Sequence, residues 1–176
     1  MKINCRLTFT AVALMAASAM GISAVGQEKE NAEKLTPVKT IFVEGTHAEG
    51  EEGAAMVADG HKWTKWCLDA PKEMPYKITL DAGKSIALKA YALTTAEDTH
   101  SYPMRNPIAW NIYGSNDCKE WKTVEQIKYS RKLSDENEQT YFFKIQPQKQ
   151  WRYYRFEFTR MTEGTRIQLA EIELYE

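Results

Sequence analysis

The chain has 176 residues, with 23 lysines and arginines against 24 aspartates and glutamates, a formal net charge of −1. One domain of ordinary size fits this length. Charges of both signs are interspersed along the sequence, whereas nucleic-acid-binding proteins concentrate basic residues on one face. We therefore expect no nucleic-acid partner.

The first 26 residues have the pattern of a secretory signal peptide. Lys2 and Arg6 precede an uncharged apolar stretch over residues 7–20, and small residues follow it. The stretch is too short and too rich in alanine for a membrane span. We predict cleavage just before Gln27 and a mature chain that is secreted, periplasmic or on the cell surface, with no membrane span.

Residues 27–37 are mostly polar and lack a periodic pattern, which predicts a flexible leader before a single domain over residues 38–176. Loss of Lys2 and Arg6 with the signal peptide reduces 23 basic residues to 21 against 24 acidic, a formal charge of −3. This weak negative balance gives no electrostatic reason to expect binding to nucleic acid.

Two cysteines remain after cleavage, Cys67 and Cys118. Disulfides form in exported proteins, and sequence alone does not give the distance between the two sulfur atoms. Cys67 follows Trp66 in a predicted buried segment, whereas Cys118 falls at a predicted hairpin tip. We therefore favour two unbridged thiols over a disulfide.

Short segments with a period of two predict β-strands, and no segment has the 3.6-residue period of an amphipathic helix. Residues 81–83 and 115–119 have the composition of turns, the second at the tip of a hairpin. The pattern predicts an all-β jelly-roll β-sandwich of about eight antiparallel strands. The predicted strands cover residues 38–44, 76–80, 85–94, 110–114, 121–127, 140–145, 153–159 and 167–175.

Most of the aromatic residues are interpreted as core residues. Tyr154, Phe156 and Phe158 share one face of their predicted strand, and Trp110 and Trp121 flank the predicted hairpin at inward positions. This leaves few aromatic side chains for contact with a ligand.

The last predicted strand changes its buried face. Leu169 is the last apolar residue of one alternation, and Ile172 is the first of the opposite one. A single strand cannot do this, so we predict a bulge or an irregular residue at Ala170–Glu171. Such a kink can turn a backbone carbonyl and the Glu171 carboxylate toward the same point.

Five segments carry a family pattern, in the order Ala58–Trp66, Tyr76–Lys84, Trp110–Trp121, Arg152–Phe156 and Gln168–Ile172. Together they resemble the discoidin or coagulation-factor type C domain of the galactose-binding-like superfamily, a pattern that family 32 carbohydrate-binding modules share. The resemblance covers roughly residues 38–176, and it implies a jelly-roll sandwich with a structural calcium site near one end.

Calcium takes six to eight oxygen ligands from carboxylates, carbonyls and hydroxyls. An imidazole is a poor ligand for so hard a cation, so His61 is expected to contribute its carbonyl or no atom. The alternative interpretation is that Asp59 only caps its turn and Glu171 pairs with a lysine or arginine. The residues that the resemblance implies as ligands are Asp59, His61, Thr64, Ala170 and Glu171, with the carbonyl of Met56.

The long irregular connection over residues 96–107 is the predicted ligand-binding loop, because long loops of compact domains are often functional. The resemblance implies binding by loops at one end of the sandwich. Each residue has a structural alternative: Arg105 could pair with Asp98, Tyr102 could pack on the sandwich, and His100 could be solvated. The candidate ligand-binding residues are His100, Tyr102, Arg105 and Asn106.

We predict a non-catalytic binding domain that recognises carbohydrate through this loop end. The alternative is a protein-interaction or adhesion domain that uses the same loop surface to bind a cell-surface or secreted protein; a concave site favours sugar, and a flat apolar patch favours protein. Catalysis is not expected, because His47, His61 and His100 form no recognisable constellation with a nucleophile or an acid.

Overall fold

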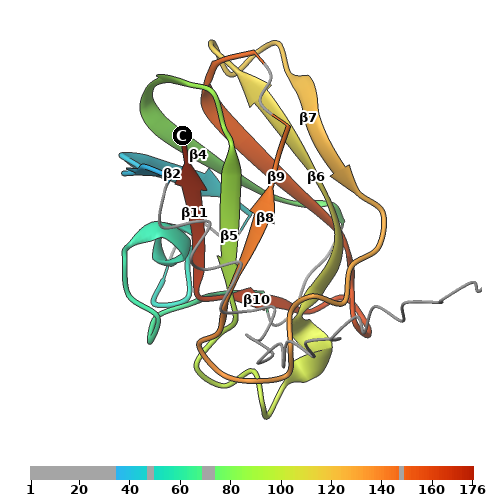
Figure 1. Cartoon of the computed structure of the whole chain (residues 1–176). Coiled ribbons are helices and arrows are strands. Elements are labelled where there is room, and N and C mark those ends of the chain that lie inside the picture. Colours follow the sequence, from blue (N-terminus) through green and yellow to red (C-terminus); the bar gives the residue numbers. More distant parts are fainter. Residues whose placement is uncertain (1–34, 47–49, 69–73, 147–148) are drawn as a thin grey trace, which may run out of the picture.

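The structure is a computed structural model that describes residues 35–46, 50–68, 74–146 and 149–176. Two antiparallel sheets pack face to face and bury one main core between them (Figure 1). The predicted all-β sandwich is therefore confirmed. The predicted signal peptide and most of the predicted leader lie outside the described residues, and no described helix is long and apolar enough to cross a membrane.

The larger sheet has the strand order β2 (Phe42–Gly45), β4 (Tyr76–Ile86), β9 (Trp151–Met161), β6 (Pro107–Ser115) and β7 (Lys122–Ile127). The opposite sheet has the order β1 (Pro37–Val38), β11 (Glu171–Tyr175), β5 (Ala90–Thr94) and β8 (Thr140–Lys144). A third ladder pairs β3 (Trp66–Leu68) with β10 (Ile167–Leu169). Two short 3₁₀ helices complete the described elements, η1 (Ala54–Ala58) and η2 (Pro103–Arg105).

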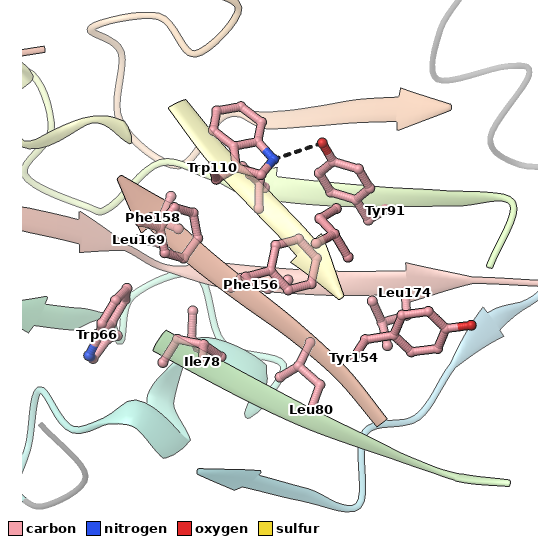
Figure 2. Close-up of a cluster of buried hydrophobic side chains, with 14 of the residues drawn as sticks. Trp66, Ile78, Leu80, Tyr91, Trp110, Tyr154, Phe156, Phe158, Leu169 and Leu174 are labelled. Atoms are coloured by element: carbon pink, nitrogen blue, oxygen red, sulfur yellow. Dashed lines mark hydrogen bonds between the residues drawn. The ribbon is translucent and has the colours of Figure 1, made fainter. Parts of the chain in front are cut away.

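The core joins the two sheets through aromatic side chains. Phe156 and Phe158 of β9 are fully buried, as is Tyr154, which confirms the predicted inward face. Trp110 of β6 donates a hydrogen bond of 2.9 Å from Nε1 to the hydroxyl of Tyr91 on the opposite sheet (Figure 2). This bond satisfies two polar groups that would be costly to bury unpaired.

Trp121 does not join this core, contrary to the prediction. It is half-buried, and the guanidinium of Arg155 lies 3.8 Å from the centroid of its ring. Trp121 precedes the first residue of β7, so strand alternation does not fix the direction of its side chain. The hairpin itself is confirmed, because β6 and β7 pair antiparallel around the turn.

The predicted turn at residues 81–83 is wrong. β4 continues through this point, with a register shift against β9 between Asp81 and Ile86. Asp81 accepts a hydrogen bond from the Gly83 N–H (2.7 Å) and forms a bidentate pair with Arg152, two bonds of 2.9 Å each. Side-chain bonds therefore stabilise a bulge where the composition indicated a chain reversal, and β5 begins only at Ala90.

The structure divides two predicted strands and so has more strands than the eight expected. Residues 38–44 separate into β1 and β2, which belong to opposite sheets. Residues 167–175 separate into β10 and β11 at Ala170, which confirms the predicted irregularity. The Ala170 N–H donates to the Thr94 carbonyl at 2.9 Å, and the chain then enters β11 with Glu171 as its first residue.

The two cysteines form no disulfide, as predicted. Cys67 is buried in β3, whereas Cys118 is exposed at the hairpin tip. Cys118 has a φ of +57° there, in the left-handed region that tight turns require.

Candidate functional site

The loop between η1 and β3 is held against the start of β11. One carboxylate oxygen of Glu171 accepts hydrogen bonds from the backbone N–H groups of Gly60 (3.0 Å) and His61 (2.8 Å). Gly60 has a φ of +85°, a conformation that glycine adopts without steric cost. Two segments far apart in the sequence are thereby joined.

Oxygen atoms of three residues gather in this loop. The hydroxyl oxygen of Thr64 lies 3.0 and 2.9 Å from the two carboxylate oxygens of Asp59 and 2.8 Å from the carbonyl oxygen of His61. Asp59 also accepts a hydrogen bond from the His61 N–H at 2.8 Å. Carboxylate, carbonyl and hydroxyl oxygens are the ligand types that calcium takes, so the donor chemistry fits this cation.

The electrostatics of Glu171 also fit a cation. Its burial and the nearby Asp59 carboxylate raise the pKa of Glu171 to about 8. Within the described ranges, neither carboxylate forms an ion pair with a lysine or arginine. Asp59 caps its turn through the His61 N–H, as the alternative interpretation expected. The lysine or arginine that this interpretation paired with Glu171 is not found among the described residues.

The remaining predicted ligands, Met56 and Ala170, lie shortly before Asp59 and directly before Glu171 in the chain. Met56 lies in η1, and Ala170 is the buried residue between β10 and β11. A hollow of about 270 Å³ is lined by Ala58, Asp59 and Glu171 among other residues. In the part of the chain that the structure describes, no group of three or more His, Cys, Asp or Glu side chains could hold a metal, so a cation here would rely on carbonyl and hydroxyl oxygens.

The predicted ligand-binding loop is anchored at its base by Lys65. The ammonium group lies 2.6 Å from Asp98, 3.2 Å from Glu97 and 3.6 Å from Glu52. Burial lowers the pKa of Lys65, but its hydrogen bonds and charge interactions with Asp98 and Glu97 outweigh this effect, and the pKa is raised. Asp98 thus fixes the loop through Lys65, where the sequence suggested a pair with Arg105.

Arg105 and Tyr102 form a stacked pair with Arg105 on the inside. Arg105 is 7% exposed, and its Nη1 lies 3.3 Å from Gln168 Oε1 and 3.6 Å from Cys67 Sγ. Its guanidinium lies 4.1 Å from the centroid of the Tyr102 ring, which is 41% exposed. The arginine therefore supports the tyrosine from below, and the tyrosine faces solvent.

Asn106 and His100 tie the same loop to the segment after β7. The Asn106 side chain is 2% exposed and donates to the Ser134 carbonyl at 2.9 Å. The His100 N–H donates to the Asn137 side chain at 2.7 Å, and the His100 residue itself is exposed. Of the four predicted ligand-binding residues, the structure therefore presents Tyr102 and His100 at the surface and turns Arg105 and Asn106 inward.

Three loops meet at this end of the sandwich, which we call the loop end: residues 96–106, 130–139 and 161–166 (Figure 1). The Thr162 N–H donates to the Asn106 carbonyl at 2.9 Å, and the Glu163 N–H donates to the Met104 carbonyl at 3.1 Å. Between the loops lies a hollow of about 470 Å³. Its lining residues are Pro103, Met104, Ile108, Arg131, Leu133, Ser134, Asp135, Thr162 and Glu163.

None of the four predicted ligand-binding residues is among the residues that line this hollow. Sequence analysis missed most of the lining, because the three loops are adjacent only in the folded chain. The available signals were the polar, turn-rich composition around residues 134–139 and the glycine of the third loop, Gly164, which has a φ of +64°. Neither signal indicates that these loops border one hollow.

A second hollow of about 350 Å³ lies along the side of the sandwich. It is lined mainly by residues of the edge strands β7 and β8, including Ile127, Phe142 and Lys144. The three loops contribute only Lys132 to it, so it forms a surface separate from the loop end.

A model of the F5/8 type C domain matches residues 41–172, which include most of both sheets and all three loops. The chain belongs to this family. The resemblance inferred from the five sequence segments is therefore confirmed. No curated protein matches the chain.

Solved structures of family 32 carbohydrate-binding modules share the fold of this F5/8 type C domain. The module of NanJ from Clostridium perfringens, in complex with galactose, has a TM-score of 0.64 and 16% identity over 81% of this chain and 99% of that chain. A Clostridium perfringens module in complex with GalNAc-β-1,3-galactose has a TM-score of 0.66 and 14% identity, over 80% and 100%.

A chitosan-binding module from a chitosanase/glucanase of Paenibacillus sp. IK-5 has a TM-score of 0.60 and 18% identity, over 79% of this chain and 96% of that chain. Identities this low establish a common fold. The ligand of the F5/8 type C domain described here has to be argued from its own surface.

The raised pKa of Glu171 predicts that, without calcium, the free energy of unfolding falls as the pH rises from about 4.5 to about 8. Over this interval the folded state keeps a proton that the unfolded carboxyl has released, so rising pH favours unfolding. Urea denaturation in chelator at several pH values measures the slope. Glu171→Gln should remove this component, and an identical pH dependence in wild type and variant would contradict the assignment.

Proposed function

We propose that this chain is a non-catalytic carbohydrate-binding domain whose glycan site is the hollow at the loop end. The observation that carries the proposal is the hollow itself. It is concave, bounded by three loops that hydrogen bonds tie together, and lined by Pro103 and Met104, which directly follow the exposed Tyr102 in the chain. Preformed concave sites with a few converging polar groups suit small ligands, whereas protein partners favour flat apolar patches.

The lining of the hollow matches the chemistry of a sugar. Pro103 and Met104 supply apolar surface for the C–H face of a pyranose, and Ser134 and Thr162 offer hydroxyls for hydrogen bonds with its rim. Arg131, Asp135 and Glu163 add charged groups that can hydrogen-bond to sugar hydroxyls. Such a mixed surface binds a ligand that has both an apolar face and hydroxyl groups.

Tyr102 is proposed as the stacking ring, with His100 as a partner for hydroxyl groups. Arg105 and Asn106 act on the ligand indirectly: the first supports the Tyr102 ring, and the second fixes the loop to Ser134. Rigid aromatic anchors that a supporting contact holds in place lose little conformational entropy on binding. The known ligands of the similar modules, galactose and GalNAc-β-1,3-galactose, support a glycan as the ligand class.

A hydrolytic role has little support from the same hollow. A glycosidase needs one carboxylic acid that its environment keeps protonated and a second carboxylate across the scissile bond. Asp135 and Glu163 both line the hollow, but both are exposed to solvent. The hollow therefore has acceptors for sugar hydroxyls and no desolvated general acid among its described residues.

We also propose a structural calcium ion between the η1–β3 loop and β11, in a domain that the signal peptide exports. Asp59, Thr64 and Glu171 would supply side-chain oxygens, with the carbonyl of His61 and those of Met56 and Ala170. A cation there would neutralise two carboxylates that otherwise repel each other. It would hold the loop and would take no direct part in sugar binding.

Tyr102→Ala should weaken glycan binding by about 1–3 kcal/mol, or roughly 5- to 150-fold in Kd, because the variant loses an exposed aromatic anchor. A glycan array of the mature domain identifies the sugar, and calorimetry measures the affinities. Phe42→Ala is the matched control, because Phe42 is an exposed aromatic residue on the edge strand β2. Equal affinity of Tyr102→Ala and wild type, with an unchanged Tm, would show that Tyr102 does not contact the glycan.

Calcium at a hundred times its Kd should raise the free energy of unfolding by about 2.7 kcal/mol. Thermal unfolding in calcium and in chelator measures the change, and elemental analysis counts the bound metal. Glu171→Gln should lose most of the response, whereas Glu120→Gln, at an exposed hairpin position, should keep it. The same Tm with calcium and with chelator, and no bound metal, would show that hydrogen bonds alone hold the loop.

A further inference from the structure

Trp63 is the most exposed of the large hydrophobic residues that the structure describes, with 67% of its surface accessible. It lies in the η1–β3 loop between two polar residues, the exposed Lys62 and the half-buried Thr64. The imidazole of His61 stacks on its indole, with ring centroids 4.5 Å apart and planes 21° from parallel. An indole that is exposed and held in a stacked pair presents a flat apolar face and one N–H group to a ligand.

The backbone beneath this pair of rings is fixed. The backbone N–H groups of Gly60 and His61 donate to Glu171, and the Thr64 hydroxyl lies within hydrogen-bond distance of Asp59. Lys62 extends from the same loop and donates to the Thr140 hydroxyl at 2.9 Å on β8. The loop therefore holds Trp63 outward from several independent anchors.

We propose that Trp63 and His61 form a second carbohydrate contact, in which the indole stacks on the apolar face of a pyranose ring and the imidazole bonds a neighbouring hydroxyl. The inference rests on the proposed carbohydrate-binding function and adds a site to it. The side-chain nitrogens of His61 have no hydrogen-bond partner among the described residues, and they lie beside the stacking surface. One flat ring with an adjacent donor or acceptor suits a sugar that has C–H groups on its face and hydroxyls at its edge.

A protein partner fits this surface less well. Stable protein interfaces bury about 800 Å² on each partner, with an apolar centre. Here the exposed neighbours of the indole in the loop are polar or lack a side chain: Asp59, Gly60, His61 and Lys62. The large apolar surface that this stretch of the loop exposes is thus the indole ring of Trp63 itself.

The two contacts belong to different loops. Trp63 lies in the η1–β3 loop, whereas the hollow is built from residues 103–108, 131–135 and 162–163. Lys65 connects the two regions, because it follows Trp63 closely and pairs with Asp98 at the base of the 96–106 loop. A glycan chain, or two chains of a polysaccharide, would then bind two sites on one domain. Simultaneous binding raises the overall affinity without any change in the affinity of either site.

Quenching of the intrinsic fluorescence by iodide reports mainly on Trp63. Trp66 and Trp110 are fully buried, Trp151 is 8% exposed and Trp121 is half-buried beneath Arg155. Iodide in solution therefore quenches mainly Trp63. We expect galactose, GalNAc-β-1,3-galactose or chitohexaose to protect this fluorescence from iodide, in wild type and equally in Tyr102→Ala.

Trp63→Ala should lower the affinity for the protective sugar roughly tenfold by calorimetry, and Trp63→Tyr should retain most of it. Sugar binding with unchanged iodide quenching and unchanged affinity of Trp63→Ala would overturn this inference and leave the loop-end proposal intact. A lower solution mass of Trp63→Ala in light scattering would overturn it in favour of a second copy of the chain. Absence of binding to every arrayed glycan would refute the proposed function, and this inference with it.

Discussion

The Glu171 carboxyl group joins the η1–β3 loop to the start of β11, and Lys65 at the end of that loop pairs with Asp98 at the base of the 96–106 loop. Glu171 stands where the chain leaves the β10–β3 ladder for the smaller sheet, and it accepts the N–H groups of Gly60 and His61. Without this contact, the loop that bears Trp63 would lose its anchor to β11. Burying a carboxyl group costs free energy unless hydrogen bonds satisfy it. At this strand junction the two backbone N–H groups do so, and they fix the connection between distant segments.

Contacts between distant segments also fix the loop end, which stands on a rigid aromatic core. The aromatic side chains of β6 and β9 fill the space between the sheets, as Trp110, Phe156 and Phe158 show (Figure 2). Because these side chains fill the core, the loops do not have to pack into it. Hydrogen bonds between the loops set the shape of the hollow. Tyr102 and Trp63 are exposed aromatic residues, as are Phe42 and Tyr129, and each of the first two is supported from one side by a guanidinium or imidazole group. Exposure combined with support distinguishes these rings from the core.

Sequence periodicity predicted the sandwich and the irregular residue at Ala170, because alternation records which face of a strand is buried. Turn-like composition misled at Asp81, where Arg152 stabilises a bulge in place of a turn, since that pair depends on a contact between distant strands. The family resemblance pointed to Asp59, Thr64 and Glu171, which the structure brings together. The inward orientation of Arg105 could not be read from its sequence, because Gln168 and Tyr102 determine it only in the folded chain.

The central claim is that a glycan occupies the hollow between the three loops. Backbone amide chemical shifts of the labelled domain, followed during titration with the glycan that binds best on the array, test it residue by residue. The account predicts that the shifted amides concentrate at residues 100–106, 131–135 and 162–164, while the strand amides of β2 and β4 stay in place. Saturable shifts confined to the β7–β8 side of the sandwich, with none at the three loops, would contradict it.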